Sequence, residues 1–112
     1  MNSVVVKSID EAAVRRAMDR YAAVLLARPD VEEVVVFGSF EKGTYAPGSD
    51  LDVLIILSHA DRPVWDRAGD LRPPRFPVPL DLFAFTRDEL VARSATPFAR
   101  ALHASSWRYR RS

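Results

Sequence analysis

The stretch VVVFGSFEKGTYAPGSDLDVLIIL, residues 34–57, decides how this chain folds and where its chemistry lies. It opens with a run of β-branched residues that stops at Gly38, and it closes with a second apolar run. Such runs are typical of buried strands, whereas the glycines and the proline between them are typical of an irregular loop. The stretch therefore predicts strands at residues 34–37 and 51–57, joined by a loop at residues 41–49.

Gly38 and Ser39 follow directly on the first predicted strand. Glycine lets the backbone turn sharply and approach a ligand closely. If a helix or nest begins at Ser39, its free N–H groups face outward and bind an anion, and the serine hydroxyl adds a donor. Taken alone, a Gly-Ser pair after a strand is most often an ordinary turn, so both interpretations stay open.

Two aspartates, Asp50 and Asp52, stand at the start of the second predicted strand. Residues at i and i+2 of a strand point to the same face, so the two carboxylates lie side by side while Leu51 and Val53 point into the core. Neighbouring carboxylates raise each other's pKa, which makes the pair costly unless a cation fills it. Mg²⁺ prefers oxygen ligands and also holds substrate phosphates. The alternative is a solvated strand start, at which Ser49 and Asp50 only mark a turn.

A third aspartate, Asp81, interrupts an apolar run that predicts a third strand at residues 78–85. A charged residue inside an apolar strand needs a partner or a metal ion. If this strand lies beside the one that carries Asp50 and Asp52, Asp81 completes a group of three carboxylates. The alternative is an edge-strand aspartate that faces water.

Composition limits the class of protein. The chain has 112 residues, 48% of them hydrophobic, a formal net charge of +1 and no cysteine. It therefore predicts one globular domain, residues 1–112, without disulfides or thiolate metal sites. The small charge argues against a bulk attraction to nucleic acid or to an anionic membrane. Because no signal peptide or membrane-length apolar run is visible, we expect a cytoplasmic protein.

Further elements are expected around these strands, which together make one mixed α/β unit. They are a helix from a capping box at residues 8–11 to Arg28 and Pro29, a short helix within residues 62–71, a helix at about residues 87–93, a helix opened by Pro97 and a short strand at residues 107–109. Glu32 and Glu33 are expected in a solvated turn before the first strand.

Gly38-Ser39, ten residues, then Asp50-Leu51-Asp52, with Asp81 on a later strand, resembles the polymerase-β-type nucleotidyltransferase superfamily. The short chain is similar to the minimal nucleotidyltransferase (MNT) branch, which includes MntA-type antitoxins. The resemblance is densest over residues 34–57. It implies an α+β fold, the polymerase-β-like nucleotidyltransferase fold, with a small mixed sheet and flanking helices.

The resemblance also implies a site and a reaction. Two Mg²⁺ ions would bridge the phosphates of a nucleotide, with ATP as the first expected donor, and AMP would pass to an acceptor as pyrophosphate leaves. The implied site residues are Asp50, Asp52 and Asp81 for catalysis and metal binding, and Gly38, Ser39, Lys42 and Ser49 for the nucleotide. Relatives often carry arginine or another small or basic residue where this chain has residues 40–42, which leaves Lys42 as the nearest basic partner for the triphosphate.

Larger relatives add a second domain that holds the acceptor, so here we expect a partner protein to supply it. In the MNT family that partner resembles a HEPN-domain ribonuclease toxin, which is neutralised by binding or by AMP transfer to a tyrosine. Two alternatives are an antitoxin that acts by binding alone and an enzyme that modifies a small molecule such as an aminoglycoside. The C-terminal residues 107–111 either form part of a partner interface or are a tail with Trp107 tucked into the core.

Overall fold

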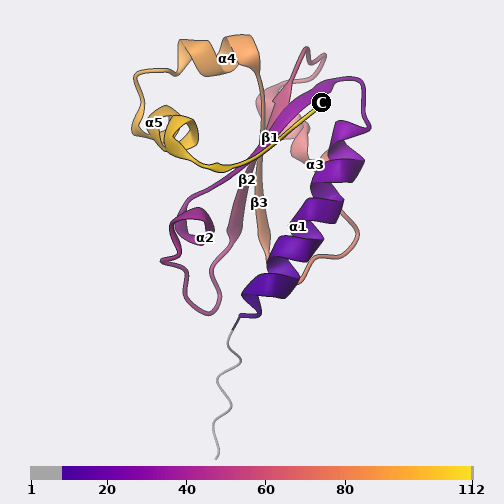
Figure 1. The fold of residues 1–112 in the computed structure, drawn as a ribbon. Coiled ribbons are helices and arrows are strands. Elements are labelled where there is room, and N and C mark those ends of the chain that lie inside the picture. The colour runs from indigo at the N-terminus through magenta and orange to yellow at the C-terminus, as the bar shows by residue number, and fades with distance from the viewer. Residues whose placement is uncertain (1–8, 112) are drawn as a thin grey trace, which may run out of the picture.

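The computed structural model describes residues 9–111. Its elements, in chain order, are α1 (Glu11–Leu26), β1 (Val31–Phe37), α2 (Ser39–Lys42), β2 (Leu51–Leu57), the 3₁₀ helix η1 (Val64–Asp66), α3 (Ala68–Leu71), β3 (Leu80–Thr86), α4 (Arg87–Ala92), α5 (Pro97–Ala104) and β4 (Trp107–Arg110) (Figure 1). None of the described helices combines the length and the apolar composition that a membrane span requires.

The four strands form one mixed sheet in the order β3-β2-β1-β4. β1 pairs antiparallel with β2 and with β4, whereas β2 and β3 run parallel. The two strands that were predicted within residues 34–57 are therefore hydrogen-bonded neighbours. This small mixed sheet with flanking helices confirms the expected α+β fold class.

Helices cover both faces of the sheet (Figure 1). On one face, Met18 of α1 packs with Val34 and Val53 in the larger core cluster. On the other face, Val35 packs with Leu102 of α5 in a second cluster. Strands that are buried on both faces read as continuous apolar runs, which is why β1 and β2 lack polar alternation over most of their length.

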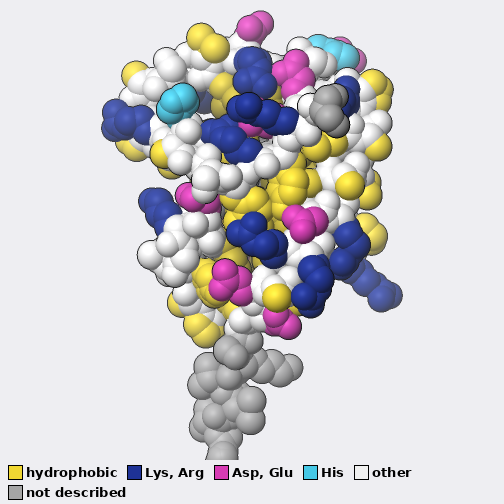
Figure 2. Space-filling view, in the orientation of Figure 1, with side chains coloured by type: hydrophobic (Ala, Val, Ile, Leu, Met, Phe, Trp, Pro, Cys, Tyr) yellow, Lys and Arg dark blue, Asp and Glu magenta, His cyan; other side chains and the backbone are white. Residues whose placement is uncertain are grey.

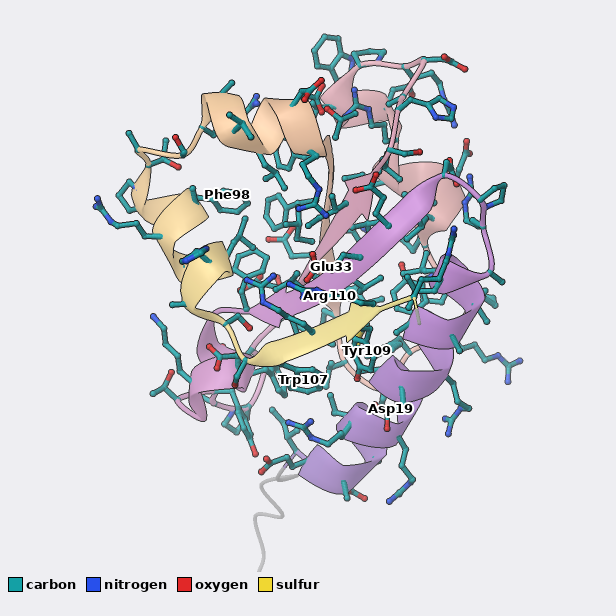
Figure 3. All side chains as sticks on the ribbon, turned by 45° about the horizontal axis from the view of Figure 1, so that its top comes forward. Asp19, Glu33, Phe98, Trp107, Tyr109 and Arg110 are labelled. Carbon is teal, nitrogen blue, oxygen red and sulfur yellow. The ribbon has the colours of Figure 1, made fainter. Side chains whose placement is uncertain are left out.

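The C-terminal residues form an ordered edge strand, as predicted, and the packed position of Trp107 is confirmed. Trp107 is only 8% exposed. Its indole N–H donates to the Tyr109 hydroxyl at 2.8 Å, and that hydroxyl donates to Asp19 of α1 at 2.6 Å (Figure 3). This chain of hydrogen bonds ties β4 to the helix that covers the same face of the sheet.

The start of the first strand differs from the prediction. β1 begins at Val31, and Glu33 lies inside it at 3% exposure, so the expected solvated turn at Glu32 and Glu33 is wrong. Arg108 and Arg110 each donate to the Glu33 carboxylate at 2.9 Å. Burial acts to raise the pKa of Glu33, but these two guanidinium groups outweigh it and hold the pKa below its ordinary value. Arginines distant in sequence thus allow an acid inside the strand.

Two further predictions need correction at their boundaries. The predicted capping box rests partly on Ser8, which lies outside the described residues; the N-cap of α1 is Asp10, whose carboxylate accepts from the Ala13 N–H at 3.0 Å. The single short helix expected within residues 62–71 is instead two pieces, η1 and α3. Arg67 lies between them, and its side chain turns into the protein.

Arg67 joins this segment to β3 and α4. It is 8% exposed and donates to the Arg62 carbonyl at 2.7 Å and to the Ala84 carbonyl at 3.0 Å. Its two terminal nitrogens bind the Glu89 carboxylate at 2.7 and 3.0 Å. Hydrogen bonds from Arg67, and then from the backbone N–H of Thr86, lower the pKa of Glu89 from 4.5 to about 2. Charge-assisted pairs of this two-point kind are among the stronger hydrogen bonds in proteins.

Replacing Glu89 with glutamine tests this ion pair. Because the folded pKa lies below the unfolded one, the carboxylate stabilises the fold above about pH 4.5, and that contribution is lost as the pH falls toward about 2. We expect Glu89→Gln to lower the free energy of unfolding by about 1–2 kcal/mol at pH 7. In urea titrations the deficit should shrink between pH 5 and pH 3, whereas Asp88→Asn, on the same helix, should change little. A deficit that stays constant with pH would contradict this role.

Candidate active site

Three segments of the chain meet at one end of the sheet (Figure 1). Gly38 follows the end of β1, Asp50 and Asp52 stand at the start of β2, and Asp81 stands near the start of β3. Because β2 runs antiparallel to β1 and parallel to β3, these three strand ends coincide. The fold thus gathers the residues that the sequence singled out.

Asp52 and Asp81 are direct partners in the register of β2 and β3. In-register neighbours on adjacent parallel strands point to the same face, with the strands about 4.8 Å apart. The expectation that the strand of Asp81 lies beside the strand of Asp52 is therefore confirmed. Asp50, two residues before Asp52, precedes the first residue of β2 and is exposed.

The three carboxylates share an unfavourable electrostatic environment. Burial raises the pKa of Asp52, and the charges of Asp81 and then Asp50 raise it further. Within residues 9–111, no lysine, arginine or histidine forms an ion pair with any of the three. The cluster therefore holds negative charge that the described protein groups do not neutralise.

The chemistry of this donor set suits a hard divalent cation. Carboxylate oxygens are the preferred ligands of Mg²⁺, and a bound cation would relieve the repulsion that raises the pKa of Asp52. In the described part of the chain, however, no three His, Cys, Asp or Glu side chains already converge as a metal-binding group. The side chains of Asp50, Asp52 and Asp81 would have to turn toward an ion in order to hold it together.

Gly38 lies directly against Asp52. Its φ of 78° is in a region that side-chain-bearing residues rarely adopt, and a Cβ atom built on it would meet Oδ2 of Asp52 at 2.2 Å. Only glycine allows the backbone to turn this close to the carboxylate. The glycine of the turn and the second aspartate of the acidic pair are thus parts of one contact.

Aromatic packing anchors the short helix that follows Gly38. Phe40 of α2 is buried and stacks on Tyr45, with ring centroids 4.5 Å apart and planes at 6°. The Tyr45 hydroxyl donates to Glu11 of α1 at 2.8 Å. Phe40 therefore packs against the protein and anchors α2. The sequence placed Glu11 in a capping box and gave no sign of its contact with Tyr45, because that contact joins a loop to a helix more than thirty residues away.

The other residues predicted to bind the nucleotide lie on the segment between β1 and β2. Ser39 opens α2 and Lys42, which is exposed, closes it. The Ser49 hydroxyl accepts a hydrogen bond from the Ala46 N–H at 2.9 Å, so it closes the turn that leads into β2. Ser39 and Lys42 lie close in sequence to Gly38, while Ser49 stabilises the loop just before the first aspartate.

Comparison with known proteins agrees with this arrangement. A family model described as a nucleotidyltransferase domain matches residues 18–93, more than half of the chain, and the chain belongs to that family. The match includes Gly38 and all three aspartates. None of the curated proteins compared with the sequence matches it.

The fold is similar to that of a solved Sulfolobus solfataricus protein that carries a provisional assignment as a nucleotidyltransferase. The TM-score is 0.53 at 21% sequence identity, over 80% of this chain and 85% of that one. At this identity the likeness concerns the fold alone. The family model and the shared fold together confirm the nucleotidyltransferase resemblance.

Substituting Gly38 tests the contact with Asp52. We expect Gly38→Ala to lower the free energy of unfolding by about 1–3 kcal/mol, because it adds backbone strain and a clash. Gly43→Ala is the matched control, since Gly43 has a φ of 75° but a Cβ atom added there would meet nothing within 4 Å. The excess cost at Gly38 should shrink in an Asp52→Ala background. Equal costs at both glycines in chemical denaturation would contradict the contact.

Neutralising Asp52 should stabilise the metal-free protein. An acid whose folded pKa is raised binds its proton more tightly in the folded state, so stability falls as the pH rises through that pKa. We expect Asp52→Asn to melt at a higher temperature than the wild type at pH 7 in EDTA, and the difference to vanish as the pH approaches 3.8, the ordinary value. Asp61→Asn, in the exposed loop after β2, is the control. A lower melting temperature for Asp52→Asn would refute this.

Proposed function

We propose that this chain transfers a nucleoside monophosphate, with AMP from ATP as the first donor to test, to a hydroxyl group of a partner protein. The role we propose is that of the antitoxin in a pair with a HEPN-domain toxin. The observation that carries the proposal is the pairing of Asp52 with Asp81 on adjacent parallel strands, with the backbone of Gly38 against Asp52.

In this proposal the carboxylates of Asp50, Asp52 and Asp81 hold Mg²⁺, which when bound neutralises charge on the phosphates. Gly38 and Ser39 receive the β- and γ-phosphates at the backbone turn, which orients the α-phosphorus toward the acceptor. The acceptor oxygen forms a bond to that phosphorus, and the bond from phosphorus to the pyrophosphate oxygen breaks. The Asp81 carboxylate is positioned to accept the proton of the acceptor hydroxyl.

Two observations support a protein acceptor and a working site. Asp50 and Asp81 are exposed, so a large acceptor can approach them. In addition, none of the described protein groups neutralises the negative charge around Asp52. This charge destabilises the free protein unless a cation binds. The second observation favours transfer over an antitoxin that acts by binding alone.

The test uses the chain co-purified with its HEPN-domain partner, incubated with ATP and Mg²⁺ and analysed by intact-protein mass spectrometry. We expect an AMP mass increment on the partner, and a loss of rate on the order of 100-fold or more in Asp52→Asn and in Asp81→Asn. Asp61→Asn should keep the wild-type rate. As a readout independent of activity, Mg²⁺ should raise the melting temperature of the wild type more than that of Asp52→Asn.

Other outcomes identify the alternatives. Tight partner binding without any mass increment, in wild type and variants alike, would replace this proposal with inhibition by binding alone. A mass increment on an aminoglycoside, with none on the partner, would replace the protein acceptor with a small molecule. AMP transfer that persists in Asp52→Asn would show that the reaction does not need the Asp52 carboxylate.

A further inference from the structure

A groove lies between α4 and α5 on the same face of the sheet as Asp52. It consists of two cavities of about 330 and 600 Å³. Arg87, Leu90 and His103 line both cavities, so the two are adjacent. We call the two cavities together the α4–α5 groove. None of the residues in the proposed nucleotide site lines either cavity.

The apolar surface of the α4–α5 groove that a partner can reach lies on the two helices. Leu90 of α4 and Ala99 of α5 are partly exposed, and Val91 of α4 is 67% exposed. The apolar residues of the sheet and of α5 beneath them are at most 5% exposed and belong to the core; they are Val35, Leu54, Ile56 and Leu102. The exposed valine and its partly exposed neighbours are suited to apolar side chains of a binding partner.

The walls of the groove are strongly basic. Four arginines line the two cavities, and the single carboxylate among the lining residues is Glu33; the arginines are Arg87, Arg100, Arg108 and Arg110. Figure 2 shows a group of Lys and Arg side chains in the upper centre of the view, next to hydrophobic side chains, and further Lys and Arg side chains in the lower half. The groove therefore carries more positive charge than its one acid neutralises.

The arginines differ in how much of their hydrogen-bonding capacity the protein uses. Arg108 is occupied, because it donates to Glu33 and to three backbone carbonyls. Arg110, beside Glu33 in Figure 3, donates to it only through Nε, and its side chain is 69% exposed. Arg87 is 54% exposed and forms ion pairs with Glu32 at 3.0 Å and with Glu33 at 3.5 Å.

Arg100 is the least committed of the four. It is exposed on α5, and within residues 9–111 it makes no side-chain hydrogen bond or ion pair. Because it lines the larger cavity while Arg110 lines the smaller one, free guanidinium donors are spread along the groove. A single phosphate or carboxylate would engage one end of this row, whereas a chain with several carboxylates would engage its whole length.

The groove also has a defined position relative to the proposed nucleotide site. Asp52, Leu54 and Ile56 alternate along β2 and point to one face. Four residues of strand span about 13 Å, so the part of the groove above Ile56 lies roughly that far along β2 from Asp52. The aromatic cluster of Phe37, Phe83 and Phe98 fills part of the space between them. A protein seated in the groove would thus have neighbouring residues within reach of the carboxylates.

We propose that the α4–α5 groove binds an acidic segment of the acceptor protein, in which Asp or Glu side chains alternate with apolar ones. The apolar side chains contact Leu90, Val91 and Ala99, and the carboxylates pair with Arg87, Arg100 and Arg110. The apolar surface beside the arginines favours a polypeptide over a nucleic-acid backbone. That the bound protein is the acceptor rests on the proposed function, whereas the chemistry of the groove stands without it.

A synthetic peptide tests the groove directly. The probe is a fluorescein-labelled peptide of alternating Glu and Leu, and its partner probe is the same peptide with Lys in place of Glu. By fluorescence anisotropy we expect the acidic probe to bind, and its affinity to fall with added salt. Arg100→Glu should weaken binding about tenfold or more. Arg16→Glu, an exposed arginine of α1 over the opposite face, is the matched control, and melting curves check that each variant folds.

Several outcomes would overturn the proposal. They are no binding of the acidic probe, equal binding of the basic probe, an unchanged affinity in Arg100→Glu, or an equal loss in Arg16→Glu. Binding of a single-stranded oligonucleotide that is tighter than that of the peptide and lost in Arg100→Glu would reassign the groove to nucleic acid.

A second measurement separates failure of the groove from failure of the proposed function. Arg100→Glu should raise the partner concentration needed for half-maximal AMP transfer, whereas Asp52→Asn should abolish transfer and still bind the acidic probe. AMP transfer without probe binding would support the proposed function and refute peptide binding in the groove. Probe binding without AMP transfer to any partner would support peptide binding in the groove and refute the proposed function.

Discussion

The contact between the backbone of Gly38 and the carboxylate of Asp52 is the constraint on which the site depends. It exists because β1 and β2 pair antiparallel, so that the end of one strand meets the start of the other. A side chain on Gly38 would occupy the space that Asp52 fills. The short helix after Gly38 is then held by the stacking of Phe40 on Tyr45 and by the bond from Tyr45 to Glu11. The turn at Gly38, the Asp52 carboxylate and the aromatic pair that holds α2 are therefore connected by direct contacts.

Two acids on the same face of the sheet differ in whether the fold neutralises their charge. Glu33 is surrounded by arginines, and its pKa is lowered, as expected for an acid that the fold neutralises. The charged groups that act on Asp52 are other carboxylates, and its pKa is raised. A folded protein gains stability from the first arrangement and loses stability from the second. The second is therefore the arrangement that calls for a ligand.

The sequence predicted the site better than it predicted the surroundings of the site. The strand at residues 51–57 followed from an apolar run, which is a local signal, whereas the grouping of Asp81 with the other two aspartates was implied by the family resemblance. The interior position of Glu33 and the inward turn of Arg67 did not follow. Both depend on ion pairs with residues far along the chain, Arg108 and Glu89, and a charged residue in isolation reads as exposed.

By itself, the sequence determined the class of protein, because a glycine turn and three spaced aspartates require particular residue types at particular positions along strands. It also determined which strands are buried, because burial on both faces demands continuous apolar residues. Only the tertiary structure decided that Gly38 touches Asp52, that arginines compensate Glu33, and that α4 and α5 form a groove lined by arginines. Each of these is a contact between segments distant in sequence, and no local pattern specifies which distant residue will complete it.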